Sequence, residues 1–216
     1  MEKQAHTGRR GEPLRISGRT FADLLLFGVT SAELALLSLL TPTFTLVDWI
    51  YLSQHLLVLG IALTRRPPTA QDHSVPSSVA VIVAYAYPYA QMAYLRWVPG
   101  DAAWPTGGLV LVTLAACLIG ASLVNLGRWF GIRPALRGLA VTGPYRFVRH
   151  PMYLSYVLAD IGYNLEEWNF GTVLLVMVGW VAMVYRIHAE ERMLSRDDGW
   201  SNYRGMVRYR LFPGLW

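Results

Sequence analysis

The chain contains a single cysteine and few charged residues. Cys117 lies inside an apolar run, so the 216 residues hold neither a disulfide framework nor a thiolate metal site. Charged residues make up 15% of the chain and apolar residues 54%, whereas a soluble domain carries about 25% charged residues. The composition therefore predicts a protein that resides in a membrane.

Several motifs of soluble enzymes are also missing. No G-x-G-x-x-G follows a predicted strand, the run from His188 to Glu191 is not H-E-x-x-H, and no serine stands in a nucleophile elbow. The basic residues behind the net charge of +5 border apolar segments, so membrane topology explains them better than nucleic acid does. We expect neither a metal nor a nucleic-acid partner. The polar, basic start of the chain predicts that no signal peptide is removed.

Apolar segments predict an all-α integral membrane protein with about six transmembrane helices, each needing roughly 20 residues to cross the bilayer. The predicted spans are Phe21–Leu40, Thr45–Leu63, Ser77–Trp97, Thr106–Leu126, Met152–Leu165 and Phe170–Ile187. The fifth is short and is followed by Asn164, Glu166, Glu167 and Asn169, which mark a turn. The fifth and sixth spans are therefore predicted to form a helical hairpin, with the fifth tilted or incompletely spanning.

The basic residues predict the orientation of these helices. All of the 19 Lys and Arg residues except Arg96 fall in the N-terminal tail, two connections and the C-terminal segment. With six spans these regions face one compartment, which the positive-inside rule makes the cytoplasm, together with both termini. The predicted organisation is a basic tail over 1–20, a helical pair over 21–63, a Pro-rich connection over 64–76 and a functional core over 77–216, whose cofactor site falls within 125–216.

A cationic turn runs from Gly143 to Tyr153. Pro151 suits the first position of a helix, so His150 is predicted at the N-cap, beside free backbone N–H groups and the positive end of a helix dipole. Arg146 and Arg149 flank it. Such a turn can hold a carboxylate or another acceptor-rich ligand. Alternatively, the arginines anchor at lipid headgroups and His150 only caps the helix.

Two carboxylates, Glu190 and Glu191, follow the sixth span, and the hairpin brings them to the same end as His150. Arg186 lies four residues before Glu190 and can pair with it on one helical face, leaving Glu191 to point elsewhere. A carboxylate at this level can bind the amino group of an amino-acid-like cofactor or balance a sulfonium charge. The alternative is a solvated helix exit with a local ion pair.

Further polar residues fall within or near the predicted spans, where ionisable groups are functional candidates. They are Asp23, Glu33, Gln54, His55, Asn125 and Asp160. Glu33 can stay neutral or pair with His55, and we favour structural pairing between helices over a proton path. Tyrosines surround Pro88, which can kink the third span and open a cavity.

The C-terminal half resembles the isoprenylcysteine carboxyl methyltransferase family, within a wider group of integral membrane methyltransferases that includes phospholipid N-methyltransferases. The resemblance covers about 123–216. The matching segments are 125–129 (Asn-Leu-Gly-Arg-Trp), 143–153 with its Arg-His-Pro-x-Tyr element, 190–194 with its Glu-Glu pair, and 203–214.

The resemblance implies a cytoplasm-facing site for S-adenosylmethionine and a lipid-borne methyl acceptor. Tyr145, His150, Pro151 and Tyr153 would line the cofactor site, which Glu190 and Glu191 would close from the last helix. One departure is Ser155, where the family often has glycine. This departure puts the cofactor contacts of that helix in doubt.

The reaction needs positioning and charge control, since two reactants must be held together. A carboxylate acceptor is already ionised and would be steered by Arg149 or Arg186. An ammonium acceptor would need a base, for which Glu190, Glu191 or His150 is available. The surplus of arginine favours carboxyl O-methylation of a prenylcysteine-like substrate over N-methylation of a phospholipid or other amino lipid. A small membrane transporter and a nicotinamide-dependent membrane reductase remain as alternatives of other classes.

Overall fold

The computed structural model describes residues 28, 31–32, 35, 46–64 and 66–216. Most of the predicted first span, Glu33 and the basic tail lie outside these residues. Within them the fold is mostly helical, which confirms the predicted fold class at that level. The long helices are α2 (Leu46–Thr64), α3 (Val75–Trp97), α4 (Pro105–Leu126), α5 (Pro151–Glu166) and α6 (Phe170–Leu194).

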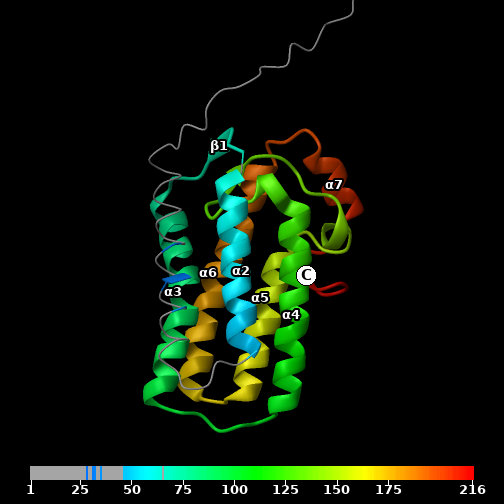
Figure 1. The fold of residues 1–216 in the computed structure, drawn as a ribbon. Helices are drawn as coiled ribbons and strands as arrows, with labels where there is room; N and C mark the ends of the chain where they lie inside the picture. The colour runs from blue at the N-terminus through cyan, green and yellow to red at the C-terminus, as the bar shows by residue number, and fades with distance from the viewer. Residues whose placement is uncertain (1–27, 29–30, 33–34, 36–45, 65) are drawn as a thin grey trace, which may run out of the picture.

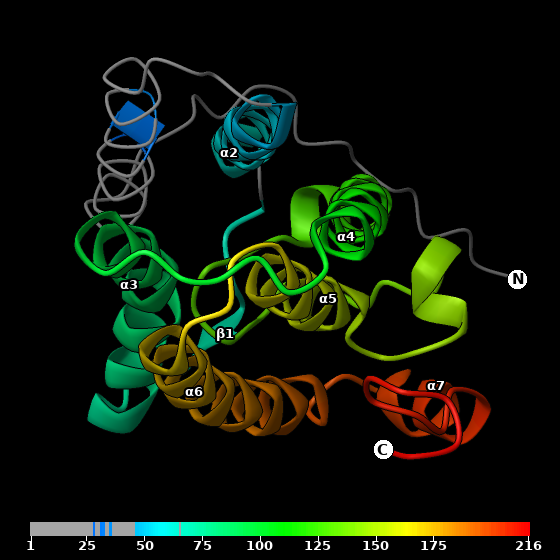
Figure 2. The ribbon, with the colours of Figure 1, turned by 90° about the horizontal axis from the view of Figure 1, so that it is seen from below.

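The long helices run side by side as a bundle (Figure 1). The connections from α3 to α4 and from α5 to α6 lie at one end, while the site segments and the short helix α7 (Trp200–Met206) lie at the other. Seen along the bundle, α5 lies between α4 and α6, and α3 flanks α6 (Figure 2). This arrangement brings the Arg-His-Pro turn before α5 and the end of α6 together.

The helix boundaries depart from the predicted spans where a local signal is stronger than hydropathy. α3 begins at Val75, ahead of the predicted Ser77, because the Ser74 side chain caps it by accepting a hydrogen bond from the Ser77 amide. α6 continues past Ile187 to Leu194. The helix therefore carries Glu190 and Glu191 at fixed positions on its surface.

The turn predicted after the fifth span begins later than expected. Asn164 lies inside α5, where its side-chain nitrogen donates to the Asp160 carbonyl and its oxygen accepts from the Thr172 hydroxyl. Asn169 caps α6 by accepting from the Gly171 amide. The predicted α5–α6 hairpin is present, with α7 following it as an element that the sequence did not predict.

The structure also contains a short antiparallel ladder, which the all-α prediction did not include. β1 (Ala70–Gln71) pairs with β2 (Ala135–Leu136), with Ala70 opposite Leu136 and Gln71 opposite Ala135. The ladder joins the Pro-rich connection to the segment between α4 and α5. The Pro-rich connection is therefore hydrogen-bonded to a segment of the predicted functional core.

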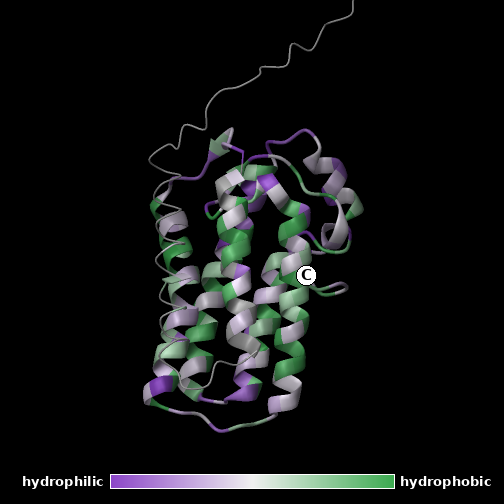
Figure 3. Cartoon of the chain, in the orientation of Figure 1, coloured by the Kyte–Doolittle hydropathy of each residue, from purple (hydrophilic) through white to green (hydrophobic). Residues whose placement is uncertain are grey.

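Apolar residues run along much of α4, α5 and α6, and most strongly hydrophilic residues lie towards the two ends of the bundle (Figure 3). Among the described residues, two helices, at 105–129 and 170–194, are long and apolar enough to cross a membrane. Exposed apolar side chains cover their outward faces, including Leu109, Val110, Leu114, Val124, Leu174, Met177, Val178 and Val181. A soluble monomer seldom exposes apolar residues in such long stripes.

Close packing of α4 on α5 depends on two glycines. A Cβ atom on Gly108 would lie 2.6 Å from the Gly162 carbonyl oxygen, and one on Gly162 would lie 2.8 Å from a methyl group of Val112. Small residues let membrane helices approach closely.

We expect Gly108→Ala to lower the free energy of unfolding by about 2 kcal/mol, because the added methyl group meets backbone atoms that can yield only if the helices separate. Thermal unfolding of the detergent-purified protein measures the effect. Gly120→Ala is the matched control on the same helix, since nothing lies within 4 Å of its added Cβ. Equal melting temperatures for the two variants would show that the α4–α5 contact is looser than described.

Candidate active site

Backbone hydrogen bonds from the segment 207–216 hold the turn before α5. The amides of Arg149 and His150 donate to the carbonyls of Tyr209 and Arg210, both at 2.9 Å. The Tyr203 hydroxyl on α7 donates to the Tyr145 carbonyl at 2.8 Å. The position of the turn is therefore fixed through its main chain.

The entry to this turn needs glycine. Gly143 has φ +58°, and a Cβ there would lie 2.4 Å from the side-chain nitrogen of Asn125. The Thr142 hydroxyl donates to the Asn125 oxygen at 3.0 Å. Asn125 at the end of α4 thus packs under the turn that the sequence motif begins.

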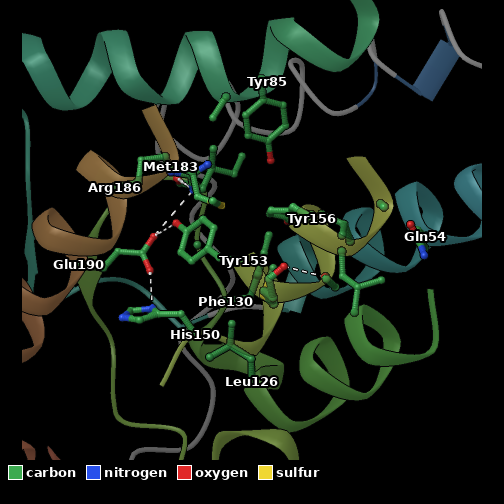
Figure 4. A pocket seen from close by; sticks show the side chains of 18 of the residues that line it. Gln54, Tyr85, Leu126, Phe130, His150, Tyr153, Tyr156, Met183, Arg186 and Glu190 are labelled. Carbon is green, nitrogen blue, oxygen red and sulfur yellow. Dashed lines mark hydrogen bonds and ion pairs between the residues drawn. The ribbon is translucent and has the colours of Figure 1, made fainter. Parts of the chain in front are cut away.

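His150 stands at the N-cap of α5, as predicted, but its side chain makes no capping hydrogen bond. Its Nε2 lies 3.4 Å from Glu191 Oε1 and its Nδ1 lies 3.9 Å from Glu190 Oε2. The ring is buried and faces the two carboxylates, and its approach to Glu190 is visible in Figure 4. The alternative in which His150 only caps the helix does not describe this geometry.

Glu190 faces Tyr153 on α5 and Arg186 on the preceding turn of α6 (Figure 4). The Tyr153 hydroxyl donates to its carboxylate, and a terminal nitrogen of Arg186 lies 3.8 Å away. The Arg186–Glu190 pair that the sequence spacing allows is thus present. Glu190 lines the large cavity described below.

Glu191 lies among three cationic or ionisable side chains. Arg210 donates to its Oε2 through Nε at 3.0 Å and through a terminal nitrogen at 2.9 Å. Arg149 Nε lies 3.4 Å from its Oε1, on the same side as His150. Glu191 is not among the described residues that line the cavity. The neighbouring carboxylates therefore have different surroundings, one facing the cavity and one neutralising arginines.

Arg149 is buried, with 7% of its surface exposed, so it is not a headgroup anchor; Arg146 in the same turn is exposed. The Nε and one terminal nitrogen of Arg149 make no hydrogen bond, and the guanidinium carbon of Arg149 lies 5.9 Å from the Trp200 ring centroid. Burial lowers the pKa of Arg149, which Glu191 partly opposes. Arg149 lines the cavity, so its guanidinium is a candidate partner for an acceptor bound there.

Arg186 offers a second set of donors one helical turn below Glu190. It is 8% exposed, donates to the Ile132 carbonyl at 2.9 Å and lies over the Tyr153 ring at 5.4 Å. Its Nε makes no hydrogen bond. Arg186 also lines the cavity.

The cavity has a volume of about 280 Å³. At the site end its walls include Tyr145, Arg149, His150 and Tyr203, and from there it extends between the helices to Met92 on α3. Figure 4 shows Tyr85, Tyr156 and Met183 along its length. The cavity therefore joins a polar, charged mouth to an interior lined largely by aromatic and aliphatic groups.

The residues proposed from the sequence gather at this mouth. Tyr145, His150, Tyr153, Glu190 and the two arginines line the cavity, whereas Pro151 is buried at the start of α5. Burial raises the pKa of Tyr145, which keeps its hydroxyl protonated. Ser155 also lines the cavity, but its hydroxyl donates to the Met152 carbonyl at 2.6 Å.

Three contributors were missed from the sequence. Arg210 provides the shortest contacts to Glu191, Trp200 lies beside the Arg149 guanidinium, and Tyr203 holds the turn. The segment 203–214 was recognised as a matching element, but no charge pattern in it pointed to Glu191. Within the described residues, no group of three or more His, Cys, Asp or Glu side chains could hold a metal ion.

Comparison with known families gives one match. The family model described as phospholipid methyltransferase matches residues 102–197, a range that contains both the Arg-His-Pro turn and the Glu190–Glu191 pair. No curated protein matches the chain. Together with the apolar helices, the family match supports a membrane methyltransferase.

Proposed function

We propose that this protein is an S-adenosylmethionine-dependent methyltransferase of the membrane that methylates a lipid-borne acceptor, by carboxyl O-methylation of a prenylcysteine-like substrate. The observation that carries the proposal is the mouth of the cavity. There, buried Arg149 lies 3.4 Å from Glu191, and His150 lies 3.4 Å from Glu191 and 3.9 Å from Glu190. The family match over the same segment supports methyl transfer as the chemistry.

The side chains at the mouth fit the charges of the cofactor. S-adenosylmethionine carries a carboxylate, an ammonium group and a sulfonium. The guanidinium of Arg149, two of whose nitrogens make no hydrogen bond, suits the carboxylate, because arginine binds carboxylates through paired N–H groups. The carboxylate of Glu190 faces the cavity and suits either cation. His150 and Tyr153 orient Glu190 from the α5 side.

The bound cofactor supplies a methyl group whose bond to sulfur breaks as a lone pair of the acceptor forms the new bond, leaving a neutral thioether. The protein contributes position and charge. Arg186 lies one helical turn before Glu190, and its Nε makes no hydrogen bond. It can hold an acceptor carboxylate in line with the methyl group of the cofactor. Such an acceptor needs no base, since it is ionised at neutral pH.

N-methylation of an amino lipid is the second candidate. The description of the matching family as phospholipid methyltransferase favours it. Glu190, whose side chain is 24% exposed, can take the proton that an ammonium acceptor must lose before it attacks. Both reactions use the same mouth, so the acceptor class decides between them.

The acceptor is proposed to enter from the bilayer. The cavity continues between the helices beyond the mouth, and a prenyl or acyl tail loses stabilisation if it leaves an apolar environment. The positive-inside distribution of arginines supports a mouth that faces the cytoplasm. Cofactor would then come from water and acceptor from lipid.

Calorimetric titration of S-adenosylmethionine into detergent-purified protein tests the proposal. We expect wild-type binding, and we expect His150→Ala to weaken it roughly tenfold or more because Glu190 and Glu191 lose a shared neighbour. Arg146→Ala is the matched control from the same turn, with its exposed side chain expected to leave binding unchanged.

A tritiated-methyl screen then compares carboxylate and amine acceptors with hydrophobic tails. Labelling of a prenylcysteine-like acid supports carboxyl methylation, and labelling of amino lipids alone supports the second candidate. Absence of cofactor binding by well-folded wild type overturns the enzyme proposal. In that case, flux measurements in liposomes would test the transporter alternative.

A further inference from the structure

The cavity contains a carboxylate that the proposed methyl transfer does not use. Asp160 on α5 is 6% exposed and lines the cavity. It lies seven residues beyond Tyr153, or about two helical turns on the same face, which places it about 10 Å farther along the helix axis. A group at that depth cannot contact the same atoms as Glu190.

Asp160 joins three helices. Its Oδ2 accepts from the Tyr87 hydroxyl at 2.9 Å and from Trp180 Nε1 at 2.7 Å. Its Oδ1 has a 3.2 Å contact with the same Tyr87 hydroxyl, whose single proton already serves Oδ2. Since an ionised carboxylate has about four acceptor positions, Oδ1 retains capacity on a group that lines the cavity.

No cation compensates this carboxylate within the described part of the chain, where no Lys, Arg or His nitrogen forms an ion pair with it. Burying a charged or polar group without its full set of partners is costly. The inner end of the cavity therefore has an acceptor with an energetic need for a donor.

A second acceptor lies in the same part of the cavity, because Pro88 interrupts α3. Proline has no N–H, so the hydrogen bond that residue 88 would donate to the Ala84 carbonyl cannot form. Ala84 and Pro88 both line the cavity. The Ala84 carbonyl thus lacks its ordinary helical partner, on a residue that belongs to the cavity wall.

One donor of this region, the Tyr87 hydroxyl, is already bonded to Asp160. Tyr87 packs directly on Gly179, where a Cβ would lie 2.6 Å from a ring carbon. The glycine lets the ring lie flat against α6, so that its hydroxyl reaches Asp160. The Tyr87 and Trp180 protons are already used on Oδ2, so a ligand in the cavity can supply a further hydrogen to Oδ1.

We propose that the inner end of the cavity binds a hydrogen-bond donor, a hydroxyl or an amine, carried by the methyl acceptor about two helical turns from its reacting group. The inference rests on the proposed function and narrows it. A purely hydrocarbon prenyl or acyl tail offers no donor to Asp160. Among lipid-borne acceptors, prenylcysteine-like ones included, the preferred one therefore carries a donor at its far end and is polar at both ends.

Equilibrium binding of a ligand series to the wild-type protein tests this without any variant. The probes are fatty acids of several chain lengths, each compared with its ω-hydroxy and ω-amino counterparts. We expect either the ω-hydroxy or the ω-amino acid to bind roughly tenfold more tightly than the parent fatty acid. The preference should be largest at one chain length, because both ends of the site are fixed. Preference for the hydroxyl or for the amine identifies the donor.

Asp160→Leu provides the second arm, with the measured quantity being the ratio of functionalised to parent affinity. Loss of the preference in this variant supports the inference, and equal binding of all three classes by wild type overturns it. A preference that survives Asp160→Leu also overturns it. Titration of S-adenosylmethionine into the same preparations separates the two proposals. Cofactor binding without a preference for the ω-hydroxy or ω-amino acids supports the methyltransferase and overturns the inner site. A preference for those acids without cofactor binding supports the inner site alone.

Discussion

Glu191→Gln is expected to lower the thermal stability of the protein and to weaken S-adenosylmethionine binding, whereas Glu190→Gln is expected to weaken binding alone. Glu191 neutralises Arg210 and Arg149 at 2.9 to 3.4 Å, with side-chain exposures of 11% for Glu191 and 5% for Arg149. Removing one partner of a buried ion pair leaves the other charge uncompensated, at a cost of about 3 kcal/mol or more. Glu190 has a more exposed side chain and faces the cavity.

The two glutamine variants are matched controls for each other, because each is isosteric and changes one charge at adjacent positions. Melting temperature measured without cofactor reports the structural contribution, and calorimetry reports binding. If Glu191→Gln melted like wild type yet bound no cofactor, Glu191 would be a direct ligand contact. The assignment of Glu190 as the cavity-facing carboxylate would then be wrong.

Arg149→Met is expected to abolish or strongly weaken cofactor binding while leaving the melting temperature of the cofactor-free protein unchanged or raised. The guanidinium is buried with two nitrogens that make no hydrogen bond, so its free state carries a desolvation cost that methionine does not. Glu191 keeps Arg210 and His150 as neighbours. Loss of charge-assisted hydrogen bonds to a carboxylate predicts an affinity decrease of roughly 10- to 100-fold.

Weaker cofactor binding together with an unchanged or raised melting temperature would identify Arg149 as a ligand-binding residue. Groups kept at a cost to stability for the sake of a ligand give variants that are stable but inactive. Arg149→Lys keeps the charge but not the planar pair of donors, and we expect it to recover only part of the affinity. A destabilised Arg149→Met with near-normal affinity would make Arg149 a structural cation that supports Glu191.

The sequence predicted the helices well because long apolar runs and their caps are local signals. Helices α2 to α6 coincide with five of the predicted segments to within a few residues, apart from the extension of α6. How many of them cross the bilayer stays a prediction, as does the orientation. α7 and the β1–β2 ladder were missed because seven and two residues, respectively, are too few to show a hydrophobic period.

The composition of the candidate site was predictable where topology alone brings motifs together. His150 and the glutamates meet because a hairpin returns the chain to its starting end. The separate roles of Glu190 and Glu191 were not predictable, because they depend on Arg210, which follows a helix that the sequence did not reveal. The partners of Asp160 likewise depend on a glycine, Gly179, that lets Tyr87 approach.

The segment 207–216 positions the Arg-His-Pro turn through backbone hydrogen bonds, and this affects which of its residues can change during evolution. At position 209 only the carbonyl is used in this contact, as the acceptor for the Arg149 amide. Almost any side chain supplies that carbonyl equally well, so residue identity at 209 is free to change in relatives without loss of the site. At position 210 the carbonyl and the guanidinium are both engaged. We therefore expect sequence comparison to mark Arg210 as constrained and to overlook a neighbour that positions the same turn.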